Sequence, residues 1–190
     1  MDANTGELIL LHYNITNFEE STKNEEEVRN IASELYKKLE LNNDFELYSL
    51  SQFDDSTWVV MFAEKKDEIF NPYNSVKLTI LPENRIIESI SINNENGEDN
   101  EVVIDENEAQ KIAIAMMKNK GHEIVNTDAE LSIRRVNSFW ENSKDNYLLQ
   151  ESDIIRKVWE IECQNSKGEK FIVYVDATTS EIVGGDSYGY

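Results

Sequence analysis

The stretch of residues 158–183, VWEIECQNSKGEKFIVYVDATTSEIV, constrains the fold more than any other part of the sequence. Trp159, Ile161 and Cys163 alternate with mostly charged residues, which predicts a strand with one apolar and one polar face. This strand is followed by a short turn with a glycine and then by a second run of β-branched and aromatic residues. A turn at residues 176–180 comes next. The pattern predicts an antiparallel meander of three strands.

The last turn of this meander occurs again at the start of the chain. Residues 2–9 read DANTGELI and residues 176–183 read DATTSEIV, with Asp, Ala, Thr, Glu and two aliphatic residues at the same spacing. A strand precedes the later copy but not the first one. We therefore expect residues 1–13 to be the remnant of a preceding repeat, its end turn and a strand at 8–13. A signal peptide or anchor is then expected upstream of these residues.

Two amphipathic helices are equivalent to each other as well. The first, at residues 24–41, begins with a capping box of Asn24 and Glu27, and the second begins at Asp105 and Glu108 and ends near Gly121. At a shift of 81 residues their apolar positions coincide. In order, Val28, Ile31, Ala32, Leu35 and Tyr36 fall on Ala109, Ile112, Ala113, Met116 and Met117.

Strands are expected after each helix. The first half has candidates at 45–52, 57–63, 76–81 and 86–92, and the second half at 130–139, 155–164, 170–175 and 181–183. Trp58 and Trp159 coincide at a shift of 101, and both are expected beneath a helix. Residues 65–74 predict a polar hairpin loop. Its apolar residues either fold back on the sheet or form a contact surface: Ile69, Phe70, Pro72 and Tyr73.

The predicted fold class is α+β, with two repeats that each pack one helix on an antiparallel meander sheet of three to four strands. Repeat 1 is expected at 24–92, a linker at 93–104, and repeat 2 at 105–190 with an insertion at about 137–154. The acidic run at 93–101 does not fit an EF-hand loop, because Ile92 would stand at the first position, where a carboxylate is needed. A solvated linker is the better interpretation.

The charge of the chain excludes some classes of partner. With 38 acidic and 18 basic residues the net charge is -20, which repels nucleic-acid phosphates and anionic lipid headgroups. No apolar run reaches about 18 residues, so no membrane span is predicted. The acidic surface either serves solubility alone or favours basic proteins, cationic peptides or divalent metal ions.

No pattern of catalytic or metal-binding residues is present. His12, His122 and Cys163 are isolated from one another, and the sequence has neither a phosphate-binding glycine loop nor a nucleophile elbow. Cys163 lies on an apolar strand face, which is typical of a small buried side chain. We therefore predict no enzyme activity, no catalytic residues, no cofactor and no metal site.

The insertion carries the best candidate for a binding surface. Aromatic and aliphatic side chains gather there, and such residues anchor many protein interfaces. The alternative is that this arm folds back over its own sheet. The candidate partner-binding residues are Phe139, Trp140, Tyr147, Leu148 and Leu149.

The order of helix, strand, W-x-I-x-C strand, turn and VYVDATTSEIV resembles the PepSY domain family, whose repeats end in V-D-A-x-T-G-E and a hydrophobic residue. The opening DANTGELI matches this ending and includes its glycine, Gly6, whereas Ser180 replaces the glycine in the second repeat. In the first repeat, residues 80–85 depart from the signature. Tandem copies of this kind resemble the exported Gram-positive proteins grouped with YcdB and YcdC.

The resemblance implies an extracellular or cell-surface protein without catalytic residues. PepSY domains occur in propeptides of thermolysin-like metallopeptidases, and restraint of a peptidase or binding of envelope partners has been proposed for them. The expected function is a noncatalytic exported module that engages a protein partner or a peptidase. The alternatives are an architectural spacer and a weak calcium-responsive module.

Overall fold

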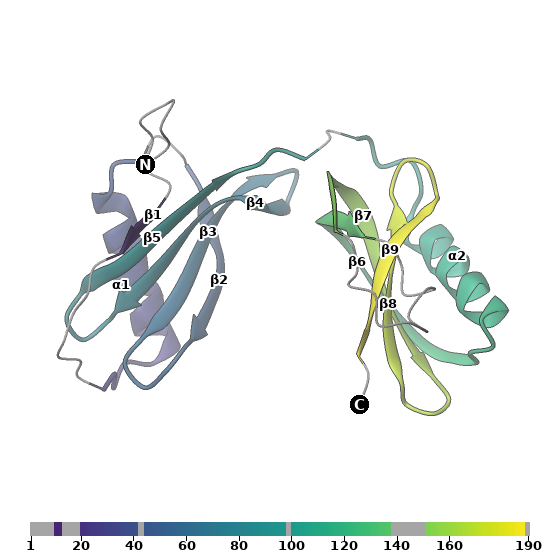
Figure 1. The fold of residues 1–190 in the computed structure, drawn as a ribbon, viewed down its shortest axis with the longest axis horizontal. Coiled ribbons are helices and arrows are strands. Elements are labelled where there is room, and N and C mark those ends of the chain that lie inside the picture. The colour runs from purple at the N-terminus through teal and green to yellow at the C-terminus, as the bar shows by residue number, and fades with distance from the viewer. Residues whose placement is uncertain (1–9, 13–19, 42–43, 98–99, 138–150, 189–190) are drawn as a thin grey trace. The chain divides into compact units, whose positions relative to one another are not determined.

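A computed structural model describes residues 10–12, 20–41, 44–97, 100–137 and 151–188. The chain divides into two compact units, residues 1–96 and 97–190 (Figure 1). Each unit contains one helix and one antiparallel sheet, so the α+β class with two repeats of a helix on a meander is confirmed.

The first unit contains helix α1 (Glu25–Lys38) and a sheet with strand order β1-β5-β4-β3-β2. Its predicted meander is present as four strands that follow the helix. The strand expected near the start of the chain is an additional edge strand, since Leu10 pairs with Ser91 and His12 with Ser89. The strands are β1 (Leu10–His12), β2 (Glu46–Gln52), β3 (Trp58–Lys66), β4 (Ile69–Leu81) and β5 (Ile86–Asn94).

Helix α1 begins as its sequence predicts. The Asn24 side chain accepts a hydrogen bond from the Glu27 amide at 3.0 Å, and the Glu27 carboxylate accepts one from the Asn24 amide at 3.1 Å. The buried face of the helix packs on inward side chains of β3 and β4, where Tyr36 stacks on Phe62 with 4.1 Å between ring centroids. The core consists of Val28, Ile31, Ala32, Leu35, Trp58, Val60, Phe62, Val76, Leu78, Ile80 and Ile90.

The prediction of a hairpin loop at residues 65–74 is wrong. Strands β3 and β4 continue to a two-residue turn at Asp67 and Glu68, which have φ angles of 52° and 66°. Pro72 is accommodated because residues 72–74 bulge out of the β3–β4 ladder, so its missing N–H costs no ladder hydrogen bond. Turns of this kind favour Asn-Gly or Asp-Gly, and an Asp-Glu pair therefore gives little signal.

The second unit contains helix α2 (Glu106–Asn119) and a sheet with strand order β6-β7-β8-β9. Asp105 caps the helix by accepting a hydrogen bond from the Glu108 amide at 2.9 Å. Cys163 is part of the buried core, where burial and then the nearby Glu162 carboxylate raise the pKa of its thiol to about 11. The strands are β6 (Ile124–Asn137), β7 (Glu151–Asn165), β8 (Lys170–Asp176) and β9 (Ile182–Tyr188).

The two sheets share one cross-strand register around their tryptophans. Trp58 lies opposite Ile80 in the first unit, and Trp159 lies opposite Val175 in the second. The next inward pairs are Val60 with Leu78 and Ile161 with Val173, followed by Phe62 with Val76 and Cys163 with Phe171. Positions in the two units can therefore be compared residue by residue.

Residues 93–104, which we expect to link the repeats, make contacts at both ends. Asn93 and Asn94 belong to β5, and the Glu95 amide donates to the Tyr73 carbonyl at 3.0 Å. Ile104 is buried in the core of the second unit. The exact limits of the repeats stay a prediction.

Candidate functional site

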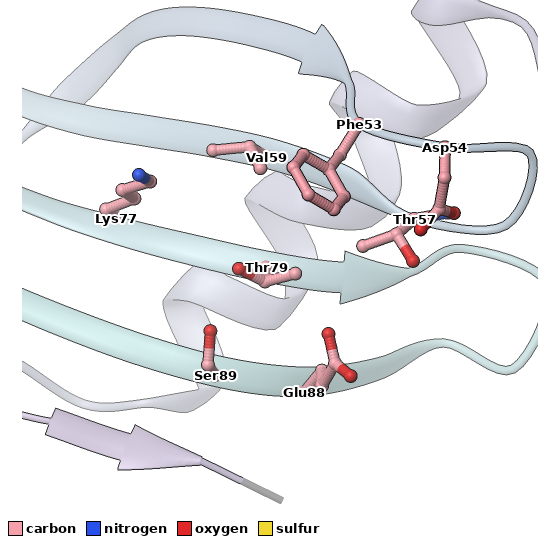
Figure 2. Close-up of a pocket in the computed structure, with 8 residues that line it drawn as sticks. All are labelled: Phe53, Asp54, Thr57, Val59, Lys77, Thr79, Glu88 and Ser89. Carbon is pink, nitrogen blue, oxygen red and sulfur yellow. The ribbon is translucent and has the colours of Figure 1, made fainter. Parts of the chain in front are cut away.

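The sheet of the first unit has one face beneath α1 and an outer face turned away from the helix. The outer face carries a hollow of roughly 410 Å³, shown in Figure 2 with α1 behind the strands. Strands β3, β4 and β5 and the β2–β3 turn supply its walls. The lining residues are Phe53, Asp54, Thr57, Val59, Lys77, Thr79, Glu88 and Ser89.

Strand alternation and a β-bulge place these side chains. Because Val60 and Leu78 point into the core, their neighbours on β3 and β4 point outward. In β5, Ser89 pairs with Thr79 and Ile87 pairs with Ile80, which leaves Glu88 as an extra residue. The bulge therefore turns both Glu88 and Ser89 toward the hollow while Ile87 and Ile90 stay on the core side.

A closely bonded turn holds Phe53 at the rim of the hollow. The Phe53 amide donates to the Thr57 carbonyl at 2.9 Å. The Asp54 carboxylate accepts hydrogen bonds from the Ser56 amide and hydroxyl, both at 2.9 Å, and from the Thr57 amide at 2.8 Å. These bonds, with that of the Ser56 amide first, lower the pKa of Asp54. Phe53 is nevertheless 75% exposed, so a fixed turn presents its ring to solvent.

Two charged side chains without a partner among the described residues, Lys77 and Glu88, lie at the edges of the hollow. Within the described part of the chain, neither Lys77 nor Glu88 has an ion pair or a side-chain hydrogen bond. Figure 2 shows the Glu88 carboxylate at the same end of the strands as the Phe53 ring but across β4 from it, and the Lys77 ammonium toward the other end. Val59 and the methyl groups of Thr57 and Thr79 give the site an apolar floor. An aromatic ring in the wall and charged groups at the rim are features of sites that bind a ligand or a partner protein.

The same place in the second unit is closed. By the shared register, Val158, Ile172, Tyr174 and Val183 stand where the first unit has Thr57, Lys77, Thr79 and Glu88. They form a separate apolar cluster in which Val158, Ile172 and Tyr174 are buried. Burial is the main cause that raises the pKa of Tyr174. The second cause is the Asp186 carboxylate, which accepts a hydrogen bond from the Tyr174 hydroxyl.

The sequence-predicted binding residues Phe139, Trp140, Tyr147, Leu148 and Leu149 lie outside the described residues. The hollow itself was not anticipated. Two sequence signals point to it: Phe53 directly precedes the turn sequence Asp-Asp-Ser, and Glu88 with Ser89 interrupts the apolar alternation of β5. Neither signal identifies a site until the strands are paired.

The His122 and Cys163 side chains pack against neighbouring residues of the second unit. The His122 ring lies against Phe171 with 4.6 Å between ring centroids, and Cys163 is buried. Across the described ranges, no three His, Cys, Asp or Glu side chains gather in a way that could hold a metal ion. No helix within those ranges is long and apolar enough to cross a membrane.

The repeated helix-on-meander units define a two-repeat α+β module. The chain is similar to the C-terminal domain of YpeB from Bacillus megaterium, at 12% identity and a TM-score of 0.54, over 96% of this chain and 72% of that one. A second similar structure is YpmB from Bacillus subtilis, at 19% identity and a TM-score of 0.26, over 87% of this chain and 100% of that one.

No protein-family model matches the sequence. No curated protein matches it either. The likeness to the YpeB domain therefore establishes the fold and leaves the function to be argued from the site.

Proposed function

We propose that this chain is a noncatalytic binding module of an exported protein and that it engages a protein partner through the outer face of its first unit. The observation that carries the proposal is the open hollow beside Phe53, a 75% exposed aromatic ring on a closely bonded turn. Large rigid side chains beside a pocket are typical of the anchors of protein interfaces. The closed equivalent in the second unit supports it, because the shared frame does not require a hollow.

We further propose that restraint of a peptidase is the form this binding takes, in keeping with the PepSY-like fold. The test mixes the protein with secreted metallopeptidases and follows substrate cleavage. Slower cleavage is expected, and Phe53→Ala should relieve it. Val125→Ala is the matched control, because Val125 is an exposed apolar residue of the second unit. Unchanged cleavage at micromolar excess would remove the inhibitory form of the proposal.

The placement of the module in its parent protein is also a proposal. It comprises repeats at 24–92 and 105–190, a remnant of an earlier repeat at 1–13, and an extracellular or cell-surface location. The arm residues Phe139, Trp140, Tyr147, Leu148 and Leu149 stay candidates for a second contact with the partner. A full-length parent sequence with a signal peptide or an anchor would support this arrangement, and a parent without either would contradict it.

An architectural spacer is the second candidate. The specific observation in its favour is the repetition of one unit with the same register around Trp58 and Trp159. Pulldowns from envelope extracts separate the two functions. A binding module should lose a partner on Phe53→Ala or on the double change Trp140→Ala and Leu148→Ala, whereas a spacer should retain no partner that depends on either.

A further inference from the structure

We infer that the hollow of the first unit binds one cationic side chain, an arginine or lysine of a partner segment, between the Phe53 ring and the Glu88 carboxylate. This inference rests on the proposed function, because it names the chemistry of the partner at the same site. Three features of the molecule support it: the charge of the chain, the composition of the hollow, and the contrast with the second unit.

The charge of the chain favours a basic partner at long range. A net charge of -20 attracts cationic surfaces and repels anionic ones. Most acidic residues of a surface provide only this diffuse attraction, which is screened beyond roughly 8 Å at physiological salt. A specific contact needs a carboxylate that is free to pair, and Glu88 is such a group within the described part of the chain.

The hollow matches the parts of a basic side chain in order. Val59 and the methyl groups of Thr57 and Thr79 offer an apolar floor for the methylene stem. The face of the Phe53 ring attracts a cation through its quadrupole, and the carboxylate of Glu88 accepts charge-assisted hydrogen bonds. A guanidinium uses both at once, because its plane stacks on a ring while its edge donates. Arginine is therefore expected to bind more tightly than lysine.

Lys77 gives the site a direction. Its ammonium lies at the end of the hollow away from Glu88 (Figure 2). A second cation at that end would be repelled, whereas a carboxylate of the partner would be attracted. The preferred partner segment therefore presents a single basic side chain with an acidic residue or none beside it, rather than a continuous basic run.

The second unit provides an internal contrast. Val183 stands in the place of Glu88, and Ile172 stands in the place of Lys77. Its outer face has a buried apolar cluster there, so these two equivalent positions carry no charge. Specific cation binding is therefore expected in the first unit alone, even though acidic residues occur in both.

The test titrates the whole chain with short peptides, acetylated and amidated at their ends, that carry one arginine, one lysine or one citrulline among glycines. Citrulline keeps the shape of arginine and removes its charge. Amide NMR shifts at residues 53–59 and 86–90 report the site. We expect the arginine peptide to bind, the lysine peptide to bind more weakly, and the citrulline peptide to bind about tenfold more weakly than arginine.

The variants separate a specific site from diffuse attraction. Glu88→Gln should weaken arginine binding by about tenfold, and Phe53→Ala by several-fold. Glu130→Gln changes the net charge equally at an exposed position of the second unit and should leave binding unchanged. Phe53 is exposed and Glu88 is half-buried, and circular dichroism checks that each variant folds. Equal weakening by Glu88→Gln and Glu130→Gln, or equal binding of arginine and citrulline, would overturn the inference.

The outcome is distinguishable from failure of the proposed function. If a protein partner binds through Phe53 and is insensitive to Glu88→Gln, the inference is overturned and the proposed function stands. If the arginine peptide binds as expected but no protein partner depends on Phe53, the proposed function is overturned and the cation site stands.

Discussion

The two units share one frame but attach the segment before the helix differently. In the second unit, the indole N–H of Trp159 donates to the Ile104 carbonyl at 3.0 Å. In the first unit, the indole N–H of Trp58 is buried without a partner among the described residues. Ile104 directly precedes the capping residue of α2, as Lys23 precedes that of α1. In the second unit the tryptophan therefore also holds the segment before the helix, and this hydrogen bond is called the tether. In the first unit the equivalent tryptophan belongs only to the core.

The turn between β8 and β9 and its equivalent between β4 and β5 show the same difference. In the second unit the amides of Val103 and Ile104 donate to the Ala177 carbonyl at 2.8 and 3.1 Å. In the first unit the Thr22 amide instead donates to the Glu83 carboxylate at 2.7 Å. A backbone carbonyl does not titrate, whereas a carboxylate is protonated at low pH. The first unit therefore depends on a side chain for a contact that the second makes through its main chain.

The largest expected effect concerns Asp176, whose equivalent in the first unit is the buried Leu81. Asp176 is 1% exposed and accepts hydrogen bonds from Thr178 and Thr179 amides at 2.8 Å and from Arg156 at 2.7 Å. Asp176→Ala leaves the Arg156 charge without this partner. We expect a loss of about 3 kcal/mol in the unfolding free energy of the second unit.

Urea unfolding followed through amide NMR signals of each unit measures this loss. Asp128→Ala, at an exposed residue of β6, is the control and should change stability by no more than about 0.5 kcal/mol. Burial alone would raise the pKa of Asp176, but the hydrogen bonds from Thr179, Arg156 and Thr178 outweigh it and lower the pKa. The stabilisation is therefore complete above the unfolded pKa and is lost as pH falls through the folded one. A loss of equal size in Asp128→Ala would contradict the assignment.

The tryptophans give the next largest difference. Trp58→Phe and Trp159→Phe remove similar volumes, but only the second also breaks a hydrogen bond and leaves the Ile104 carbonyl without its donor. We expect Trp159→Phe to cost about 1 kcal/mol more than Trp58→Phe. The same urea experiment, with the two variants in parallel, measures it. Equal costs would show that the tether contributes nothing to stability.

The helices, the meanders and their equivalence were predictable because each depends on local periodicity. A few neighbouring residues are enough to recognise the helix caps at Asn24 and Asp105. The same holds for the alternation around Trp159. The Asp67–Glu68 turn was missed because its residues are poor signals for a left-handed backbone. The hollow was missed because it depends on the bulge at Glu88 and on which residues three separate strands bring together. The candidate arm at 139–149 lies outside the described residues and stays a prediction.

A smaller difference is expected at the turn position that carries glycine in the PepSY signature. Ser180 and its equivalent Arg85 both have a left-handed backbone, with φ angles of 66° and 54°. Ser180→Gly should stabilise the second unit by about 1 kcal/mol, because glycine removes the cost of this conformation. Arg85→Gly should gain less, because it also removes the ion pair of Arg85 with Glu34. Thermal unfolding of the two variants measures the gains, and a larger gain for Arg85→Gly would contradict this reasoning.

The smallest expected effect is confined to the segment before α1. The Thr22 amide first, then its hydroxyl and Lys23, lower the pKa of Glu83, so the folded state binds this proton less readily than the unfolded chain. The contact is therefore complete above the unfolded pKa and is lost as pH falls through the folded one. Hydrogen exchange should show protection of the Thr22 amide, corrected for intrinsic rates, that declines on acidification. Glu83→Gln keeps an acceptor oxygen without the titration and should make that protection independent of pH. If the native protein shows the same flat profile, the carboxylate does not hold this segment, and the contrast with the main-chain contact at Ala177 disappears.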